Sequence, residues 1–451
     1  MTQLNFSNAL FTDLYELTMA QAYWRQNMHA RATFSLFFRG YPRDRSFYAA
    51  AGIESALAYL ESFHFTNPDL EHLAATSDFD ASFLEHLAKL RFTGDVRAVP
   101  EGSLTFAGEP VVEVTAPIIQ AQLVETYLLN QVTFQTTLLT KAVRVHQAAQ
   151  NRSVVDFSAR RTHGEEAAGI AARCGWIAGF AGTSNVRAAA IYDIPAVGTM
   201  AHSFVQAFDH EIDAFRVYSE EFPRSTTLLV DTYDTARGVQ NAITVANEME
   251  ERGERLQAIR IDSGDFASET KKARQALDDA GLKYVRIVVS GGLDEYAIAD
   301  LLAEGAPVDS FGVGTRFGVS SDAPHADSAY KLVEYDGRPS LKTSEGKATL
   351  PGPKQVHRFS VSGYYTGDMI STVDETAPEG SEPLLRTVMK DGKRLEQTEP
   401  LEKARHRLSE QLARLPARNR HLRHPAHYPV TVSHKLQALR DREALARRSQ
   451  Q

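Results

Sequence analysis

Between residues 153 and 315, seven short apolar runs alternate with segments of helical composition. Each run gives way to polar or small residues before the next helical segment. Strict alternation of strand, loop and helix predicts parallel strands joined by crossover helices. About seven such units close most easily into an irregular parallel α/β barrel, whose active site lies where the strands end. A doubly wound open sheet is the alternative. The runs are SVVDFSA, GFAGTSN, AVGTMAH, TTLLVDT, AIRIDSG, VRIVVSG and DSFGVGT.

The alternation is confined to the middle of the chain, which predicts a second domain made from both ends. Residues 1–117 combine a helix around TDLYELTMAQAYW with β-type runs. Residues 329–451 open with hairpin material at an Asp336-Gly337 turn and end in two helical stretches. We therefore expect residues 118–328 to form the barrel that holds the active site. The N-terminal and C-terminal segments would together form a discontinuous α+β domain.

Composition excludes several classes of protein. The net charge of −8 gives no reason to expect a nucleic-acid or membrane partner, because such partners are usually met by a basic excess. The single cysteine, Cys174, cannot form an intrachain disulfide, which fits a reducing compartment. The chain has no signal-peptide pattern and no run approaching 18 apolar residues. We therefore expect a cytoplasmic protein without a membrane span.

The last part of the chain is basic. Residues 401–451 contain twelve Lys or Arg against four Asp or Glu. An RNA-binding arm would carry such a charge. Leu and Ala at helical spacings in this segment favour amphipathic helices with solvated basic faces instead. No motif assigns the charge a role.

The ends of the predicted strands collect an unusual set of side chains at one mouth. The set mixes guanidinium groups, carboxylates, hydroxyls and glycine loops. Its members are Asp156, Phe157, Arg160, Arg161, Thr183, Ser184, Thr199, His202, Ser203, Asp231, Arg260, Asp262, Asp265, Ser290, Gly291, Gly292, Gly312, Gly314 and Thr315.

Two of these loops, VVSGGLDEYAI and FGVGTRFGV, carry glycines where a strand gives way to a helix. Backbone N–H groups there can approach an anion closely, and the start of a helix adds partial positive charge. In α/β barrels a phosphate commonly lies after the last two strands. Tight turns alone would explain one such loop. Two in succession favour a phosphate site at these loops.

The segment RIDSGD carries three charged candidates. Asp262 and Asp265 are spaced to face one site, where they could hold Mg²⁺ or stabilise a developing cation. Capping of the following helix is the alternative, and Asp265 is the better candidate for it. Arg260 precedes Asp262 by two residues and so points the same way from a strand. An arginine in a barrel mouth needs an anion.

Two other positions are ambiguous on local sequence alone. His202, in AVGTMAHSF, is either a packed histidine at a strand end or a reacting group. Phe157 followed by Arg160 suits a planar anionic ligand, although phenylalanines at strand ends are usually core.

The chain resembles the nicotinate phosphoribosyltransferases, which share the type II phosphoribosyltransferase fold with the nicotinamide and quinolinate enzymes. The motifs that carry the resemblance occur in order along most of the chain: TDLYELTMAQAYW, FSARRTHG, GFAGTSNVRAA, AVGTMAHSFVQAF, IRIDSGD, VSGGLDE and FGVGT. The resemblance implies that the protein makes nicotinate mononucleotide and pyrophosphate from nicotinate and phosphoribosyl pyrophosphate in NAD salvage. It also implies Mg²⁺ and an ATP co-substrate that is hydrolysed through a phosphohistidine.

The same resemblance implies roles for individual residues. His202 would be phosphorylated, Asp262 would lie near the ribose carbon and the metal, and Arg260 would meet anionic groups of the substrate. A homodimer would share its sites, with Tyr15 and Arg39 contributed by the second subunit and the pyridine ring between Tyr15 and Phe157. The remaining substrate-binding residues would be Arg160, Ser184, Thr199, Ser203, Ser290, Gly291, Gly314 and Thr315.

Ser184 bears on the choice of pyridine. Related nicotinamide enzymes carry an aspartate at this position of the GTSN motif. A carboxylate there accepts a hydrogen bond from an amide but repels a carboxylate, so serine favours nicotinate. Quinolinate enzymes are shorter and lack the phosphorylated histidine.

Two functions of other classes are a nucleotide sensor that has lost catalysis and an unrelated barrel aldolase or isomerase. A sensor would lack some of the catalytic residues at the strand ends, whereas the charged residues and both glycine loops are present. The seven runs contain no lysine for a Schiff base, which counts against an aldolase.

Overall fold

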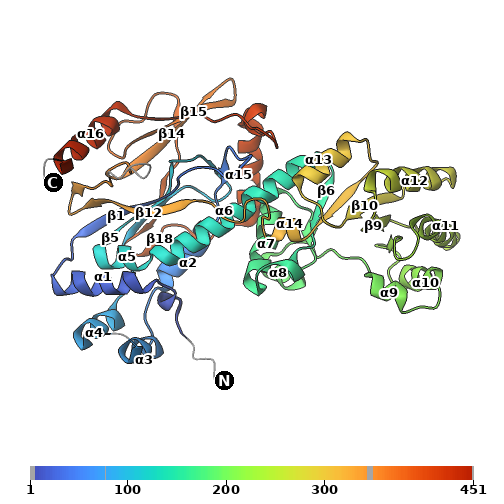
Figure 1. The fold of residues 1–451 in the computed structure, drawn as a ribbon, viewed down its shortest axis with the longest axis horizontal. Coiled ribbons are helices and arrows are strands. Elements are labelled where there is room, and N and C mark those ends of the chain that lie inside the picture. The colour runs from blue at the N-terminus through green and yellow to red at the C-terminus, as the bar shows by residue number, and fades with distance from the viewer. Residues whose placement is uncertain (1–5, 77, 343–348, 449–451) are drawn as a thin grey trace. The chain divides into compact units, whose positions relative to one another are not determined.

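The computed structural model describes residues 6–76, 78–342 and 349–448. The chain forms two compact units (Figure 1). The first contains Met1–Thr140 and His325–Gln451, and the second contains Lys141–Pro324. The first unit is therefore built from both ends of the chain.

A parallel sheet of six strands runs through the second unit. Its order is β7-β6-β11-β10-β9-β8, so the first strand in the chain pairs with the last. Because every neighbouring pair is parallel, all six carboxyl ends lie at one edge of the sheet. In chain order the strands are β6 (Ser153–Asp156), β7 (Gly182–Thr183), β8 (Thr227–Leu229), β9 (Ala258–Ile261), β10 (Arg286–Ser290) and β11 (Ser310–Val313).

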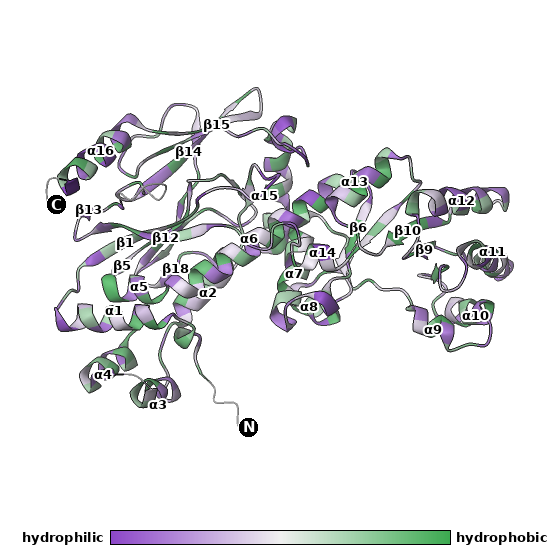
Figure 2. Cartoon of the chain, in the orientation of Figure 1, coloured by the Kyte–Doolittle hydropathy of each residue, from purple (hydrophilic) through white to green (hydrophobic). Residues whose placement is uncertain are grey.

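Helices connect these strands. In α11 the buried residues Val239, Ala242, Ala246 and Met249 recur every three or four positions and form one apolar stripe. Figure 2 shows that α11 carries both hydrophilic and hydrophobic residues. The helices are α7 (Glu165–Ala178), α8 (Val186–Tyr192), α9 (His202–Gln206), α10 (Glu211–Glu221), α11 (Thr235–Glu251), α12 (Phe266–Asp279), α13 (Glu295–Ala303) and α14 (Thr315–Gly318).

The predicted run AVGTMAH does not form a strand, so the sheet has six strands where seven were expected. The run pairs with β7 only at Ala196, through a single bridge to Thr183. Beyond Gly198 the chain leaves the sheet, because the Arg260 guanidinium binds the Thr199 hydroxyl and the Met200 carbonyl. The two end strands, β7 and β8, are not paired with each other.

The first unit contains two sheets and a short β ladder. Strand β1 pairs with β5 on one side and with β12 on the other, so the N-terminal and C-terminal segments share one sheet. The seven-stranded sheet has the order β13-β12-β1-β5-β3-β17-β18, the four-stranded sheet has the order β16-β14-β15-β19, and β2 pairs with β4. The strands are β1 (Arg31–Phe38), β2 (Tyr48–Ala49), β3 (Asp95–Ala98), β4 (Leu104–Thr105), β5 (Pro110–Pro117), β12 (Ser328–Tyr335), β13 (Arg338–Pro339), β14 (Lys354–Val361), β15 (Tyr364–Thr372), β16 (Ser381–Pro383), β17 (Arg386–Lys390), β18 (Lys393–Arg394) and β19 (Val430–Val432).

The predicted hairpin at Asp336-Gly337 is confirmed. It joins β12 to β13, with Tyr335 opposite Arg338. Both turn residues have positive φ, 53° and 70°, as a two-residue turn of this type requires.

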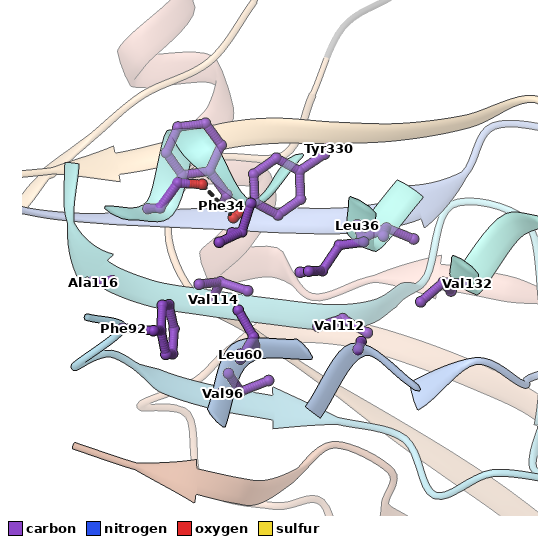
Figure 3. Close-up of a cluster of buried hydrophobic side chains, with 14 of the residues drawn as sticks. Phe34, Leu36, Leu60, Phe92, Val96, Val112, Val114, Ala116, Val132 and Tyr330 are labelled. Atoms are coloured by element: carbon purple, nitrogen blue, oxygen red, sulfur yellow. Dashed lines mark hydrogen bonds between the residues drawn. The ribbon is translucent and has the colours of Figure 1, made fainter. Parts of the chain in front are cut away.

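A continuous hydrophobic core lies against the seven-stranded sheet. Figure 3 shows Phe34 and Leu36 of β1 together with Val112 and Val114 of β5, and all four side chains are buried. Tyr330 of β12 stacks on Phe34 with ring centres 4.8 Å apart. Alternate residues of each strand thus face the core, as the strand period of two requires.

Helices complete the first unit. The basic C-terminal segment forms α15 and α16, which confirms its amphipathic helical interpretation. In the described part of the chain no helix is both long and apolar enough to cross a membrane. The helices are α1 (Leu14–Arg25), α2 (Ile53–Ser62), α3 (Asn67–Thr76), α4 (Ala81–Lys89), α5 (Ile118–Leu123), α15 (Leu401–Arg414), α16 (His434–Arg448) and α6 (Glu125–Ala148), whose last turns belong to the second unit.

Candidate active site at the carboxyl ends of the parallel strands

Arg260, on β9, is the centre of a hydrogen-bonded cluster at the carboxyl edge of the sheet. Its Nε donates to Ser290 Oγ at 2.8 Å, and its Nη2 donates to Asp262 Oδ1 at 2.7 Å. Its Nη1 donates to Thr199 Oγ1 at 2.7 Å. The guanidinium carbon also lies over the Phe157 ring, 5.6 Å from the ring centre. We use the name Arg260 cluster for Phe157, Thr199, His202, Arg260, Asp262 and Ser290.

Asp262 is held in its ionised form. Burial raises the pKa of this carboxyl group, but hydrogen bonds from Arg260 and Ser290 and the charge of Arg260 lower the pKa by more. The resulting pKa lies below that of an ordinary aspartate. Ser290 Oγ donates to the same oxygen, Oδ1, that Arg260 binds. The other oxygen, Oδ2, faces His202.

His202 is the first residue of α9. Its Nδ1 lies 3.2 Å from Thr232 Oγ1, and its Nε2 lies 3.9 Å from Asp262 Oδ2. The second distance is too long for a hydrogen bond. The side chain is 39% exposed, which is not the environment of a packed core histidine. The structure therefore presents an oriented imidazole beside a carboxylate.

Asp231, just after β8, supplies a second carboxylate. Its Oδ2 accepts hydrogen bonds from the Asp262 amide at 2.9 Å and the Ser263 hydroxyl at 2.6 Å. Its Oδ1 is buried and has no hydrogen-bond partner among the described residues. Mg²⁺ usually takes one or two carboxylates together with water and phosphate oxygens, so this pair of aspartates fits Mg²⁺. Within the described ranges no group of three or more His, Cys, Asp or Glu could hold a metal by itself.

The two glycine loops follow β10 and β11. Gly291 has a φ of +102°, and a Cβ there would lie 2.0 Å from the Asp262 carbonyl oxygen, so only glycine fits. Among the hydrogen bonds of the described residues, the amides of Gly291, Gly292 and Gly314 donate to no protein acceptor. These amides are therefore available to an anion.

Two amides in the first turn of α13 are already occupied by a side chain. Asp294 Oδ1 caps this helix by accepting hydrogen bonds from the Tyr296 and Ala297 amides. Its Oδ2 binds Arg316 Nη1 at 2.9 Å and so links the two glycine loops. Anion binding would therefore use the loop amides and not the first turn of α13.

Asp156 organises the loop after β6. It is 1% exposed, and it accepts hydrogen bonds from the Ser158 amide and the Thr183 hydroxyl, both at 2.7 Å. Its carbonyl oxygen accepts the Ser184 amide at 2.8 Å. Burial raises the pKa of Asp156 despite these hydrogen bonds. The adjacent Phe157 is thereby held beside Arg260.

Several residues that the sequence predicted for the site make none of these contacts. Arg160, Ser203 and Thr315 are exposed, and their side chains make no hydrogen bond to another described residue. Asp265 is a helix cap, as its alternative interpretation held, because its Oδ1 accepts the Ser268 amide at 3.2 Å.

Tyr15 and Arg39 belong to the first unit. Tyr15, on α1, is 48% exposed, and burial of its hydroxyl followed by the charge of Glu125 raises its pKa, so the phenol keeps its proton. Arg39 follows β1 and binds Asp327 through Nη1 at 2.7 Å.

Models of protein families match three parts of the chain. The N-terminal domain of nicotinate phosphoribosyltransferase matches residues 10–133, the nicotinate phosphoribosyltransferase family matches residues 152–337, and the C-terminal domain matches residues 378–440. The chain belongs to the nicotinate phosphoribosyltransferase family.

Relatives of this nicotinate phosphoribosyltransferase family member cover most of its length. A nicotinate phosphoribosyltransferase of Mycobacterium tuberculosis is 49% identical over 95% of this chain and 92% of its own. The Bacillus subtilis enzyme of the same name is 42% identical over 82% of this chain and 77% of its own. The crystal structure of human nicotinic acid phosphoribosyltransferase has a TM-score of 0.87 and 31% identity, covering 96% of this chain and 99% of that one.

Sequence reasoning had assigned no role to five residues that organise the site of this family member. Asp156 and Asp231 were noted only as strand-end residues, and Thr232 and the Asp294–Arg316 pair were not singled out. An aspartate at the end of an apolar run is a sequence signal that could have drawn attention to the first two. The contacts of the others depend on how loops far apart in the sequence meet.

Proposed function

We propose that this protein forms nicotinate mononucleotide and pyrophosphate from nicotinate and phosphoribosyl pyrophosphate. The reaction would be coupled to ATP hydrolysis through phosphorylated His202, in the Preiss-Handler route of NAD salvage. The observation that carries the proposal is the Arg260 cluster, which lies at the strand ends beside two glycine loops with unused amides. The names of the bacterial and human relatives support the same activity.

The ribosyl transfer needs charge stabilisation more than a base. The bond from the anomeric carbon to pyrophosphate breaks with its electron pair leaving on oxygen, and the pyridine nitrogen lone pair forms the new C–N bond. No proton is lost from the nitrogen, so no general base is required. Asp262, kept ionised by Arg260 and Ser290, would stabilise the positive charge that develops on the ribose.

Asp262 and Asp231 would hold Mg²⁺, because each offers a carboxylate oxygen that Arg260 and the backbone amides do not occupy. Bound there, the ion would neutralise charge on the leaving pyrophosphate. The amides of Gly291, Gly292 and Gly314, with the Thr315 hydroxyl, would bind the 5-phosphate of the ribose. Arg160 would meet a second anionic group of the substrate.

His202 would carry the phosphoryl group of ATP. A ring nitrogen attacks the γ-phosphorus, the bond between that phosphorus and the bridging oxygen breaks, and ADP leaves with the electron pair. Attack of water on the phosphohistidine then breaks the N–P bond and releases phosphate. The Thr232 hydroxyl at Nδ1 would fix the orientation of the ring. Thr199 and Ser203 would line the pocket beside it.

The pyridine would stack between Phe157 and Tyr15 of the partner subunit in a homodimer, with Arg39 of the partner subunit reaching the same site. Ser184 supports nicotinate as the substrate. Its amide is used by Asp156, whereas its hydroxyl makes no hydrogen bond to any described residue and could donate one to a carboxylate.

We also propose that the parallel sheet represents an α/β barrel with one open seam. The order of its strands is cyclic, because successive strands are neighbours and β6 pairs with β11. The seam lies between the Ala196 bridge and β8. A doubly wound sheet would instead have its first strand near the middle, with the order reversing there.

The proposal is tested by offering nicotinate, nicotinamide and quinolinate separately with phosphoribosyl pyrophosphate and Mg²⁺, with and without ATP. Mononucleotide and pyrophosphate are measured. We expect nicotinate to be preferred by at least about a hundredfold and ATP to raise the yield. Ser184→Asp should shift the preference towards nicotinamide. Equal or greater activity of the unaltered protein with nicotinamide would refute the substrate assignment.

A further inference from the structure

A cavity with cationic residues in its lining lies in the first unit, between the segment after β1 and the segment before β19. Its volume is about 520 Å³. Residues 40–45 form one wall, and His424, Pro425 and His427 form the other. We call this cavity the basic pocket. It shares no residue with the Arg260 cluster.

Cationic and imidazole groups dominate the lining of the basic pocket. The Arg43 side chain is 88% exposed, whereas Arg45 is only 7% exposed. Asp44 is the one carboxylate among the lining residues, and both of its oxygens lie near protein groups. Its Oδ1 accepts the His424 amide at 3.0 Å, and its Oδ2 lies 3.6 Å from Arg43 Nε.

The two walls are tied together by hydrogen bonds. Ser46 Oγ donates to the Asn419 carbonyl, and the Asn419 side-chain amide donates to the Ala426 carbonyl at 2.8 Å. Asn419 itself is 2% exposed. Together with the Asp44–His424 contact, these bonds hold the cavity open in the protein alone, so a ligand would not have to form it.

The segment that forms the second wall adds further positive charge. Residues 416–428 contain Arg418, Arg420 and Arg423 and no Asp or Glu. This segment accounts for part of the basic charge of the C-terminal region, to which the proposed reaction gives no role. Two arginines within one concave cavity suit a compact anion, because the planar guanidinium group matches phosphate oxygens in pairs.

We propose that the basic pocket binds a phosphate-bearing anion, either an inorganic polyphosphate or the phosphate chain of a nucleotide. Arg45 would contact the anion from the floor of the pocket, and Arg43 and His427 would contact it from the rim. The site would act in addition to the one proposed for ribosyl transfer, and it does not depend on the identity of that reaction.

Hydrogen exchange measured by mass spectrometry tests the proposal with the full chain. Phosphate, pyrophosphate and ATP are titrated separately, and protection is followed in peptides covering residues 40–48 and 416–428. At least one anion should protect both peptides in a saturable way, and the anion with the lowest half-saturation concentration identifies the source. Anion binding at the Arg260 cluster, which Arg39 of the partner subunit is proposed to reach, would not protect residues 416–428, so protection of both peptides distinguishes the basic pocket from that site. Absence of saturable protection by all three anions would overturn the proposal.

A double variant tests whether the rim residues bind the anion. Arg43→Gln with His427→Gln should raise the half-saturation concentration at least about tenfold, because it removes charge-assisted hydrogen bonds. Arg386→Gln is the matched control, since Arg386 is an exposed arginine on β17 of the same unit. Equal half-saturation in the double variant and the control would also overturn the proposal. Neither variant should alter mononucleotide formation in the absence of added effector anion.

Discussion

Arg260 links the chemistry of the site to the path of the chain. Its side chain is 12% exposed, and its three guanidinium nitrogens all donate hydrogen bonds. One side of the group keeps Asp262 ionised, and the other holds Thr199 and the Met200 carbonyl in the loop that leads to His202. A single residue thus sets the positions of the proposed cation-stabilising carboxylate and the proposed phosphoryl acceptor.

A residue-scale prediction concerns Glu16, which is 0% exposed on α1. Burial raises its pKa to about 7, although hydrogen bonds from Thr12 and Thr126 lower it. Between about pH 4.5 and pH 7 the folded protein therefore keeps a proton that the unfolded chain releases. The contribution of Glu16 to stability should fall as the pH rises through this window.

Glu16→Gln should thus match the natural protein in stability near pH 5 and exceed it at pH 8, by on the order of 1 kcal/mol. Urea unfolding at the two pH values measures the difference. Glu85→Gln, at an exposed position on α4, is the control and should show no such dependence on pH. Parallel pH profiles for Glu16→Gln and the natural protein would show that Glu16 is ionised in the fold.

At the scale of elements, a buried ionic network binds residues that follow each of the two glycine loops. Lys141 and Arg144 of α6 both bind Glu295, the first residue of α13, and Lys141 also binds Asp322 at 2.6 Å. The Lys141 and Glu295 side chains are 0% exposed. Glu295 follows the first glycine loop, and Asp322 follows α14 and the second. The network therefore ties both loops to one helix.

Lys141→Met should destabilise the protein by about 3–5 kcal/mol, because Glu295 and Asp322 both lose a buried cationic partner, while Arg144 still binds Glu295. Any folded fraction should show a raised KM for phosphoribosyl pyrophosphate with a smaller change in kcat. Lys272→Met is the matched control, since Lys272 binds Glu269 in an exposed pair on α12, and it should cost less than about 1 kcal/mol. Equal unfolding free energies for the two variants would contradict the role of the network.

The first glycine loop offers a sharper comparison between neighbours. Gly291→Ala should raise the KM for phosphoribosyl pyrophosphate at least about tenfold, because a Cβ would clash with the Asp262 carbonyl and move the loop. Gly292→Ala is the comparison variant: its φ of +64° is also positive, but a Cβ there meets no atom within 4 Å. Similar KM values for the two variants would mean that the loop does not need this close approach.

Periodicity in the sequence predicted seven strands and the polar edge where they end, and six of those strands are present. The strand predicted at AVGTMAH is absent because Arg260, about sixty residues later, binds Thr199 and the Met200 carbonyl of this segment. Likewise, Asp294 caps the start of α13, so the amide of Ala297 is not free to bind a phosphate. Local patterns encode neither contact, since both depend on which loops meet at the edge of the sheet.

At the scale of the whole molecule, the motifs in the sequence identified the family, and the family models confirm it along most of the chain. Side-chain types at the strand ends were also predictable, because parallel strands bring their carboxyl ends together. The second carboxylate, Asp231, was not assigned a role, since its orphaned oxygen is visible only once the Asp262 amide is placed beside it.

The shared site of the proposed homodimer predicts complementation. Tyr15→Ala removes a residue contributed by one subunit, and His202→Ala removes a residue contributed by the other. After the two inactive proteins are unfolded together and refolded at equal concentration, half of the dimers carry one intact site. ATP-coupled activity should recover to about a quarter of the natural level. No recovery, with heterodimers confirmed by mass spectrometry, would mean that each site is built within one chain.

The most direct test of the proposed chemistry is to locate the phosphoryl group that ATP transfers to the protein. The protein is incubated with ATP labelled in its γ-phosphate, and labelled peptides are mapped by mass spectrometry under conditions that preserve phosphohistidine. We predict acid-labile label on His202, none in His202→Ala, and slow ATP-independent formation of nicotinate mononucleotide by that variant. Label on another residue, or unchanged labelling of His202→Ala, would contradict the assignment of His202 as the phosphoryl carrier.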